Sequence, residues 1–264
     1  MSNAIKITKG LDLNLYGAPM PEVVETFVSE YALKPKDFIG LIPKLMIEEG
    51  ERVKAGTPLF YAKGKEKVLF TSPVSGVVKQ VKRGAKRVIE EVIISAEETV
   101  EYLDFGVSNI SELSAEQIKE KLLVSGAWTL LRQRPYSVVP SPDTTPKCII
   151  VSGFSSAPLA PDYSVLLKGL NKELQAGIDV LKKMTGVTIH VNLPAKKGRA
   201  DELAQLQNAQ INTFEGKHPC GNVSVQIEKL DPINKSERVW YLDAQDLVAI
   251  GRLFLEGKYD TTRL

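Results

Sequence analysis

The sequence predicts an α+β multidomain protein in which a β-rich part precedes an α/β part. At about 150 residues per domain, a chain of 264 residues accommodates roughly two domains. In residues 5–104, short β-branched and aromatic runs are separated by Gly and Pro every ~8–12 residues, which is typical of a small barrel or sandwich. After residue 146, apolar strand-like runs alternate with helical stretches, which favours an open and largely parallel sheet.

The β-rich part predicts a barrel-sandwich. Residues 49–59 and 71–78 place glycines where tight turns are needed and apolar side chains such as Val53 and Leu59 in the interior. This pattern resembles the biotinyl/lipoyl carrier fold, and residues 83–88 repeat the turn of the first half. The expected strands are residues 5–7, 24–28, 45–47, 59–61, 68–70, 77–81 and 88–94. We therefore expect a biotinyl/lipoyl-like β-domain.

A lysine at the hairpin tip would be the modified residue of a true carrier, and Lys65 stands near that position. Lys65 lies between Lys63 and Lys67 without a Met-Lys-Met sequence, which favours an unmodified, solvated hairpin over a lipoyl or biotinyl lysine. The surrounding basic patch comprises Lys63, Lys65, Lys67, Lys79, Lys82, Arg83, Lys86 and Arg87. Such a patch is either a contact for anionic lipid or an acidic partner, or a solvated face.

Charge and hydropathy exclude several classes of protein. The formal net charge is +2, from 34 Lys and Arg against 32 Asp and Glu, so no nucleic-acid partner is expected. No apolar run approaches the roughly 18–20 residues of a membrane span. The N-terminus lacks the pattern of a signal peptide, which favours a cytoplasmic protein.

Residues 105–145 predict a helical and Pro-rich connector. Ser114 and Gln117 have the spacing of a capping box, and the apolar residues that follow share one helical face. We expect a second short helix over residues 127–132 and an extended segment over residues 134–143, where proline is frequent.

Residues 146–264 predict a Rossmann-like α/β domain. The expected strands are residues 148–151, 187–191, 211–214, 223–227 and 239–242, and the expected helices are residues 164–184, 200–206 and 244–255. The run 148–151 is apolar throughout, as in a strand buried on both faces. Asp243 is the expected cap of the last helix, which Gly257 ends.

The turn after the first of these strands lacks the usual dinucleotide-binding glycines. A Rossmann unit would carry Gly-x-Gly-x-x-Gly there, whereas this sequence has only Gly153, followed by Phe154 and Pro158. Phe154 and Pro158 would hinder the approach of the backbone to a pyrophosphate. The sequence therefore predicts that this domain binds neither NADH nor FMN by that route.

The cysteines and histidines offer little for a metal or a nucleophile. Cys148 and Cys220 are the only cysteines, which excludes a disulfide scaffold, and only His190 and His218 accompany them. His218, in a turn with Pro219, is either a proton carrier in contact with a quinone or a histidine that hydrogen-bonds the loop, and we favour the second. No acid that would orient a Cys220–His218 pair is visible, so no catalytic residue is expected.

Several segments together resemble one protein family. They are residues 5–13, 131–140, 216–221, 230–232, 239–240 and 245–254. The chain resembles the A subunit of the bacterial Na⁺-translocating NADH:quinone oxidoreductase over residues 5–264. Lys217 and Cys220 stand where Pro and Ala are usual in the family. Because the family's chain is longer, we expect this sequence to be an N-terminal fragment, inactive in isolation.

The resemblance implies a peripheral member of a six-subunit complex on the cytoplasmic side of the bacterial inner membrane. That complex passes electrons from NADH through FAD, FMN and an iron–sulfur centre to ubiquinone and expels Na⁺. The family is akin to the NADH- and flavin-binding subunit of respiratory complex I. Because the Gly-rich cofactor loop is degenerate here, the resemblance implies a subunit that kept the fold and lost the flavin. It implies that this chain has no transmembrane segment and that its partners are the other subunits of the complex.

The implied role lies in the quinone-reduction half of the reaction. A quinone ring would suit an apolar pocket with polar residues at its mouth, and the candidates are Arg132, Arg134, Tyr136 and His218. Two alternatives remain open. The chain is then either an assembly or docking subunit that binds no cofactor and does no chemistry, or the C subunit of the related Rnf complex.

Overall fold

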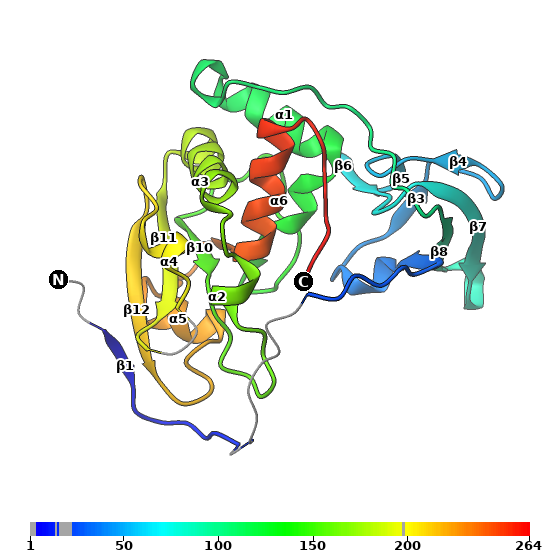
Figure 1. Cartoon of the computed structure of the whole chain (residues 1–264). Coiled ribbons are helices and arrows are strands. Elements are labelled where there is room, and N and C mark those ends of the chain that lie inside the picture. The colour runs from blue at the N-terminus through cyan, green and yellow to red at the C-terminus, as the bar shows by residue number, and fades with distance from the viewer. Residues whose placement is uncertain (1–3, 14, 16–22, 197–198) are drawn as a thin grey trace.

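The computed structural model describes residues 4–13, 15, 23–196 and 199–264. These residues form a six-stranded sheet of order β1-β12-β11-β10-β13-β9, a four-stranded sheet of order β2-β8-β7-β4 and a three-stranded sheet of order β3-β5-β6. The two smaller sheets lie beside the larger one, and helices α1 and α6 lie between the larger sheet and the two smaller ones (Figure 1). The expected combination of a barrel-sandwich domain and an α/β domain is confirmed.

The two smaller sheets enclose the core of the β-domain. Their strands are β2 (Glu30–Leu33), β3 (Pro43–Leu45), β4 (Arg52–Val53), β5 (Pro58–Ala62), β6 (Lys65–Thr71), β7 (Gly76–Arg83) and β8 (Ile89–Ala96), with short 3₁₀ turns η1 (Pro35–Asp37) and η2 (Ala85–Arg87). Phe60 and Phe70 stack at 5.0 Å between ring centroids in this core. Gly76 is required at its position, because a Cβ there would lie 2.0 Å from the Ser95 carbonyl oxygen.

The strand expected over residues 24–28 was a wrong prediction. Residues 23–28 form no strand, and the structure has its strand slightly later, at β2. The Val24 side chain is 75% exposed. Strand propensity largely reflects how well β-branched residues fit a half-buried pleated surface, and this run has no such surface to pack on. By contrast, β2 pairs with β8 from Glu30 to Leu33.

The six-stranded sheet is parallel except at one edge. Its strands are β1 (Ile5–Ile7), β9 (Arg132–Arg134), β10 (Cys148–Ser152), β11 (Thr188–Pro194), β12 (Gln210–Gly216) and β13 (Val239–Asp243). Strand β9 pairs antiparallel with β13, and β1 pairs parallel with β12. Both edge strands come from outside residues 146–264. Their chain position alone would assign them to the β-domain and the connector, whereas backbone pairing makes them part of the α/β sheet.

Helices cover both faces of this sheet. They are α1 (Ala115–Ser125), α2 (Tyr163–Leu166), α3 (Asn171–Thr185), α4 (Asp201–Ala204), α5 (Val223–Leu230) and α6 (Ala244–Leu255), with 3₁₀ turns η3 (Ile110–Glu112) and η4 (Ala127–Leu130). The expected capping boxes are present, Ser114 with Gln117 before α1 and Asp243 with Asp246 before α6. Helices α3 and α6 pack closely, because Gly251 admits the Glu173 backbone, where a Cβ would lie 1.9 Å from the Glu173 carbonyl oxygen.

Two further predictions in this domain were wrong. Residues 223–227 alternate like a strand but form helix α5, which begins after Asn222. Val223, Ile227 and Leu230 are spaced by about one helical turn and pack together on the sheet, so tertiary burial decides in favour of the helix. The long helix expected over residues 164–184 is divided into α2 and α3 around Gly169, which has φ +81°.

The β-domain and the α/β domain meet along α1 and β6. The Thr71 hydroxyl donates to the Ser125 carbonyl oxygen at 3.2 Å, and the Arg132 guanidinium lies 4.9 Å from the Phe38 ring centroid. Gly126 ends α1 with φ +84° at this contact. Throughout the part of the chain that the structure describes, no helix is long and apolar enough to cross a membrane.

Substituting Gly126 tests this contact. A Cβ at Gly126 would lie 2.4 Å from the Thr71 hydroxyl oxygen, and the left-handed φ adds a penalty of about 1–2 kcal/mol for any L-residue. Gly126→Ala is therefore expected to lower the free energy of unfolding, measured by urea denaturation, by more than the matched control Gly186→Ala. Gly186 has φ +70° but nothing within 4 Å of its Cβ position. Equal losses in the two variants would show that the contact with Thr71 is not tight.

Candidate functional site

The crevice at the carboxyl edge of the six-stranded sheet is the natural place for a ligand. From β10 the chain passes through α3 to β11, which lies on one side of β10. From β12 it passes through α5 to β13, which lies on the other side of β10. In open α/β sheets, ligands bind where the strand order reverses in this way, outside the carboxyl ends of the strands. The reversal lies between β10 and β13.

Three cavities follow one another along this edge. The outer cavity, of ≈ 290 Å³, lies at the ends of β10, β11 and β12. The central cavity, of ≈ 370 Å³, lies between β10 and β13, and the junction cavity, of ≈ 320 Å³, lies between β13 and the β-domain. Phe154, Ser155 and Tyr163 line both the outer and the central cavity. Leu242 and Asp243 line both the central and the junction cavity.

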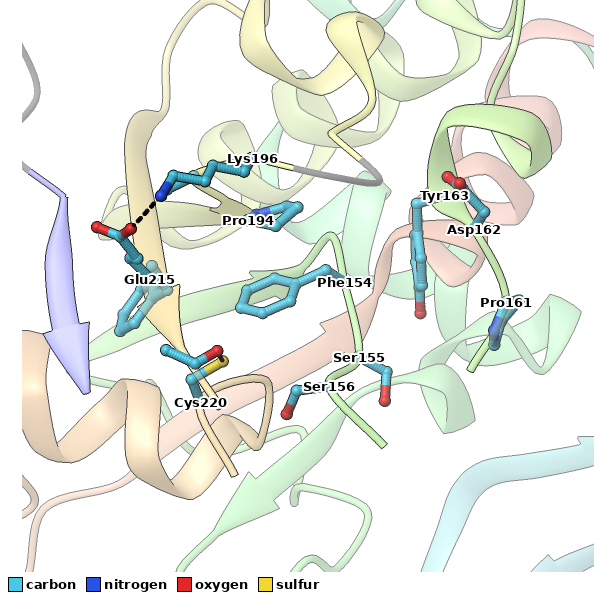
Figure 2. Close-up of a pocket in the computed structure, with 13 residues that line it drawn as sticks. Phe154, Ser155, Ser156, Pro161, Asp162, Tyr163, Pro194, Lys196, Glu215 and Cys220 are labelled. Atoms are coloured by element: carbon cyan, nitrogen blue, oxygen red, sulfur yellow. Dashed lines mark hydrogen bonds and ion pairs between the residues drawn. The ribbon is translucent and has the colours of Figure 1, made fainter. Parts of the chain in front are cut away.

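Aromatic side chains form the floor of the outer cavity. Figure 2 shows the Phe154 ring in the middle of this cavity, with Cys220 on one side and Tyr163 on the other. The Phe154 and Phe214 ring centroids are 6.4 Å apart, and both rings are buried. An ion pair between Lys196 and Glu215, 2.7 Å long, lies at the rim. The cavity therefore combines an apolar interior with a charged rim.

His218 adjoins the outer cavity through Ser156. The Ser156 hydroxyl oxygen accepts the Gly221 N–H at 2.8 Å and lies 3.1 Å from His218 Nδ1. The backbone N–H of His218 donates to the Asp12 carboxylate at 3.1 Å, and its backbone carbonyl accepts from the Leu11 N–H at 2.9 Å. His218 thus joins the N-terminal segment to the cavity wall, and its ring contacts a side-chain hydroxyl.

The cysteines and His190 are not activated for chemistry. Burial raises the pKa of the Cys220 thiol, which lies 3.1 Å from the Gly216 carbonyl oxygen. Burial likewise raises the pKa of Cys148 to about 12 and lowers the pKa of His190, so both side chains are held neutral. Among the residues that the structure describes, no group of three or more His, Cys, Asp or Glu side chains is placed to hold a metal ion.

Gly153 serves packing in this structure. Its N–H donates to the Asn192 carbonyl oxygen at 2.9 Å, and a Cβ would lie 2.6 Å from a Leu203 methyl carbon. The loop that follows is long, and α3 starts only at Asn171, without a side-chain cap. A phosphate would therefore find no helix N-terminus directly after β10, where the Rossmann motif supplies one.

A buried polar ladder beneath the crevice was missed by the sequence analysis. The Asn192 amide donates to the Gln226 side-chain oxygen at 2.9 Å, and the Asn212 amide donates to the Asn192 side-chain oxygen at 3.0 Å. Asn212 also lies 3.3 Å from His190 Nδ1. The available signal was the Asn192 amide inside a buried parallel strand, where an apolar residue is usual.

The structure separates the four residues expected at a quinone pocket. His218 adjoins the outer cavity, and Arg134 lines the central cavity. Arg132 lines the junction cavity. Tyr136 is 74% exposed and lines none of the three cavities. Arg134 and His218 therefore lie on opposite sides of the loop of Phe154, while the other two residues lie apart from it.

The basic patch divides between two hairpins that belong to different sheets. Lys65 starts β6, so the first three lysines lie on the β5–β6 hairpin, and the remaining basic residues lie on β7 and η2. Lys79 pairs with Glu30 and Lys82 with Glu91, whereas the other six form no ion pair with any residue that the structure describes. Most of the basic patch thus carries uncompensated charge.

Asp246 is the buried carboxylate of the junction cavity. Its carboxylate accepts the Asp243 N–H at 3.1 Å and pairs with Arg263. Burial raises the pKa of Asp246 to about 6, although the Arg263 charge opposes that rise. The folded protein therefore binds this proton more tightly than the unfolded chain, and the fold loses stability as the pH rises from the ordinary value of 3.8 toward about 6.

Asp246→Asn removes this charge and keeps an acceptor for the Asp243 N–H. At pH 7.5 the variant is expected to be more stable than the parent by on the order of 1–3 kcal/mol, and the difference is expected to shrink as the pH falls below about 6 and to close only near the ordinary pKa of 3.8. Thermal unfolding between pH 4.5 and 7.5 measures this difference.

Asp260→Asn is the control, because the pKa of Asp260 is shifted in the opposite direction and the expected change in stability has the opposite sign. Burial opposes ionisation of Asp260, but hydrogen bonds from Thr262 and the charge of Arg252 lower its pKa overall. This variant is therefore expected to be less stable than the parent at pH 7.5. A pH-independent difference between Asp246→Asn and the parent would contradict the assignment.

Comparison with known proteins agrees with this architecture. Residues 113–259 match the family model described as the NqrA second alpha/beta domain, and residues 5–97 match the NqrA N-terminal barrel-sandwich hybrid domain. Curated relatives named as the A subunit of Na(+)-translocating NADH-quinone reductase include those of Serratia proteamaculans, 38% identical, Hahella chejuensis, 39% identical, and Neisseria gonorrhoeae, 36% identical. Each alignment covers 98% of this chain and 58–59% of the relative. The chain therefore belongs to the NqrA family, the A subunits of the Na⁺-translocating NADH-quinone reductases.

Proposed function

We propose that this chain acts within a Na⁺-translocating NADH:ubiquinone oxidoreductase and holds the quinone headgroup in the outer cavity. Its relatives are named as the A subunit of such reductases, and the chain spans 58–59% of their length. The names of the relatives support membership of this complex, and the outer cavity is the space in which we place the quinone. This proposal assigns the chain to the quinone-reduction half of the reaction, with electrons arriving from other subunits.

The aromatic floor of the outer cavity is the observation that carries this proposal. Small-molecule sites are concave and mostly apolar, with a few convergent polar groups, and typically measure about 300–1,000 Å³. The outer cavity, at ≈ 290 Å³, suits a headgroup-sized ring. Phe154 and Phe214 offer ring faces for stacking, and Ser155 and Ser156 offer hydroxyls to quinone carbonyls.

His218 and Ser156 are suited to move a proton toward the bound quinone. Reduction of a quinone to a quinol consumes two electrons and two protons. The Ser156 hydroxyl lines the cavity and lies 3.1 Å from His218 Nδ1, so a proton carried by the imidazole has a hydroxyl between it and the cavity. Of the residues expected at the pocket mouth, this proposal retains His218 and leaves Arg132, Arg134 and Tyr136 out of the outer cavity.

We also propose that this chain itself binds no flavin, nicotinamide or iron–sulfur centre. FAD, FMN and the iron–sulfur centre of the complex would then belong to other subunits. Gly153 is engaged in packing against Leu203, and the Phe154 ring, two residues after the end of β10, packs against Phe214. These two contacts support a subunit that keeps the fold without the cofactor.

The basic patch favours a docking role as the second candidate function. Six of its residues carry charges that no acidic side chain compensates within the described part of the chain. In a peripheral subunit on the cytoplasmic side of the inner membrane, such charges would face anionic lipid or an acidic neighbouring subunit.

Filling the outer cavity tests the quinone proposal. Ala195 lines this cavity and not the other two, so Ala195→Trp in the assembled complex is expected to raise the KM for ubiquinone roughly tenfold or more. NADH oxidation with an artificial acceptor that bypasses the quinone should stay unchanged.

Ala157→Trp is the matched control, because Ala157 is exposed in the nearby loop and lines none of the cavities. An unchanged KM in Ala195→Trp would refute the assignment of the quinone to this cavity.

Reversing the charge of the β5–β6 hairpin tests the docking role. Lys63, Lys65 and Lys67 changed together to Glu are expected to weaken retention of the subunit in the purified complex severalfold, more strongly at low than at high ionic strength. The control reverses three exposed lysines of the α/β domain, Lys168, Lys172 and Lys235. Intact assembly and unchanged turnover in the first variant would rule out a docking role for this hairpin.

A further inference from the structure

The guanidinium group of Arg134 has no polar partner in the described structure. It lies over the Tyr241 ring, 5.0 Å from the ring centroid, and its Nε is buried without a hydrogen-bond acceptor. No carboxylate of the described residues lies within ion-pair distance of Arg134, whereas Arg252 pairs with Asp260 at 2.9 Å. Leaving the buried Nε–H of a charged group without an acceptor is unfavourable, so an acceptor from outside the chain would satisfy it.

Arg134 is held in place by its neighbours. Its backbone pairs with Val239 in the edge of the six-stranded sheet. The Tyr241 ring beneath its guanidinium is itself anchored, because the Tyr241 hydroxyl lies 2.6 Å from the Ser137 hydroxyl. A guanidinium stacked on an anchored ring loses little further freedom on binding, which favours recognition of an anion.

The Arg134 guanidinium belongs to a residue that borders a cavity large enough for a small anion. Arg134 lines that cavity, of ≈ 370 Å³, together with the first residues of α5 and with Ser152 and Ser155 of the opposite wall. The cavity lies between β10 and β13, where the strand order reverses. Its position is therefore the one at which open α/β sheets hold ligands, although the glycine-rich loop is missing.

Backbone donors of α5 lie at the same cavity. Val225 and Gln226 donate their N–H groups to the Asn222 carbonyl oxygen, but within the described chain the N–H groups of Val223 and Ser224 find no acceptor. The Asn222 side chain makes no capping hydrogen bond. Asn222, Val223 and Ser224 all line the central cavity, so unpaired donors of the main chain and of Arg134 border one space.

The carboxylate at this cavity is already engaged. Asp243 lines it too, but one of its oxygens accepts the Tyr163 hydroxyl and the other accepts the Gln245 N–H at 2.9 Å. Both Asp243 oxygens thus accept from neutral donors, and Asp243 forms no ion pair with Arg134.

We propose that the central cavity binds a small oxyanion, a phosphate or carboxylate group, between the Arg134 guanidinium and the first N–H groups of α5. This site is distinct from the outer cavity, where the quinone headgroup is placed above. The fork of the guanidinium matches two oxygens of either anion, and the α5 amides would take a third contact or share one of those oxygens.

Calorimetric titration of the full-length subunit with inorganic phosphate, and separately with acetate, tests this proposal. Ionic strength is held constant with NaCl. Saturable binding of at least one of the two anions is expected, and the anion bound more tightly identifies the class of ligand. Arg134→Gln is expected to weaken that binding roughly tenfold or more, and Arg134→Lys, which keeps the charge without the fork, is expected to weaken it less.

Arg132→Gln is the control, because Arg132 lies two residues earlier on the same strand and lines the junction cavity. It is expected to bind the anion as the parent does. Thermal unfolding establishes that each variant is folded before titration. Absence of saturable binding by both anions, undiminished binding by Arg134→Gln, or an equal loss in Arg132→Gln would each overturn the proposal.

Discussion

Burial of β10 on both faces is the constraint on which the α/β domain depends. All five residues of Cys148–Ser152 are buried. Because neither face of this strand meets water, helices have to cover both, and α3 and α6 take one face while α5 takes the other. After β10 the chain adds β11 and β12 on one side of that strand and then crosses to add β13 on its other side. That reversal opens the crevice in which the central cavity lies, and the outer cavity adjoins it along the same edge of the sheet.

The same crevice accounts for the unusual loop after β10. In a dinucleotide-binding domain this loop would bring its backbone close to a phosphate. Here Gly153 makes room for Leu203, Phe154 joins the aromatic floor and Ser156 contacts His218. Each of these three residues makes a packing or hydrogen-bond contact that would be broken if a pyrophosphate occupied the turn. The segment therefore forms the wall of a pocket.

Attachment of the β-domain extends the crevice. The Arg132 guanidinium packs on Phe38, and the Thr71 hydroxyl reaches the end of α1, so the two domains share one continuous junction. The junction cavity has walls from both domains, and Asp246, the third residue of α6 and the partner of Asp243 in its capping box, is buried at this place. Asp246 also accepts the N–H of Asp243, which lines the central cavity, so this hydrogen bond joins the walls of the two cavities.

Local chemistry alone was enough to predict part of this architecture. The bounds of α6 follow from the Asp243 cap and the residues that favour a helix behind it, and Ser114 marks the start of α1 in the same way. The strand at Cys148 was predictable because a fully apolar run has few alternatives in a folded chain. Turns rich in glycine likewise predicted the barrel-sandwich.

The sequence by itself therefore determined the two fold types, most of their elements and the loss of the glycine-rich motif, since caps, turns and apolar periodicity act over a few residues. Only the tertiary structure decided that Val223 starts a helix, that β1 and β9 are edges of the six-stranded sheet, and that Arg134 and His218 flank one loop while Arg132 and Tyr136 do not. These outcomes depend on pairing and burial between residues far apart in the chain, which no local pattern records.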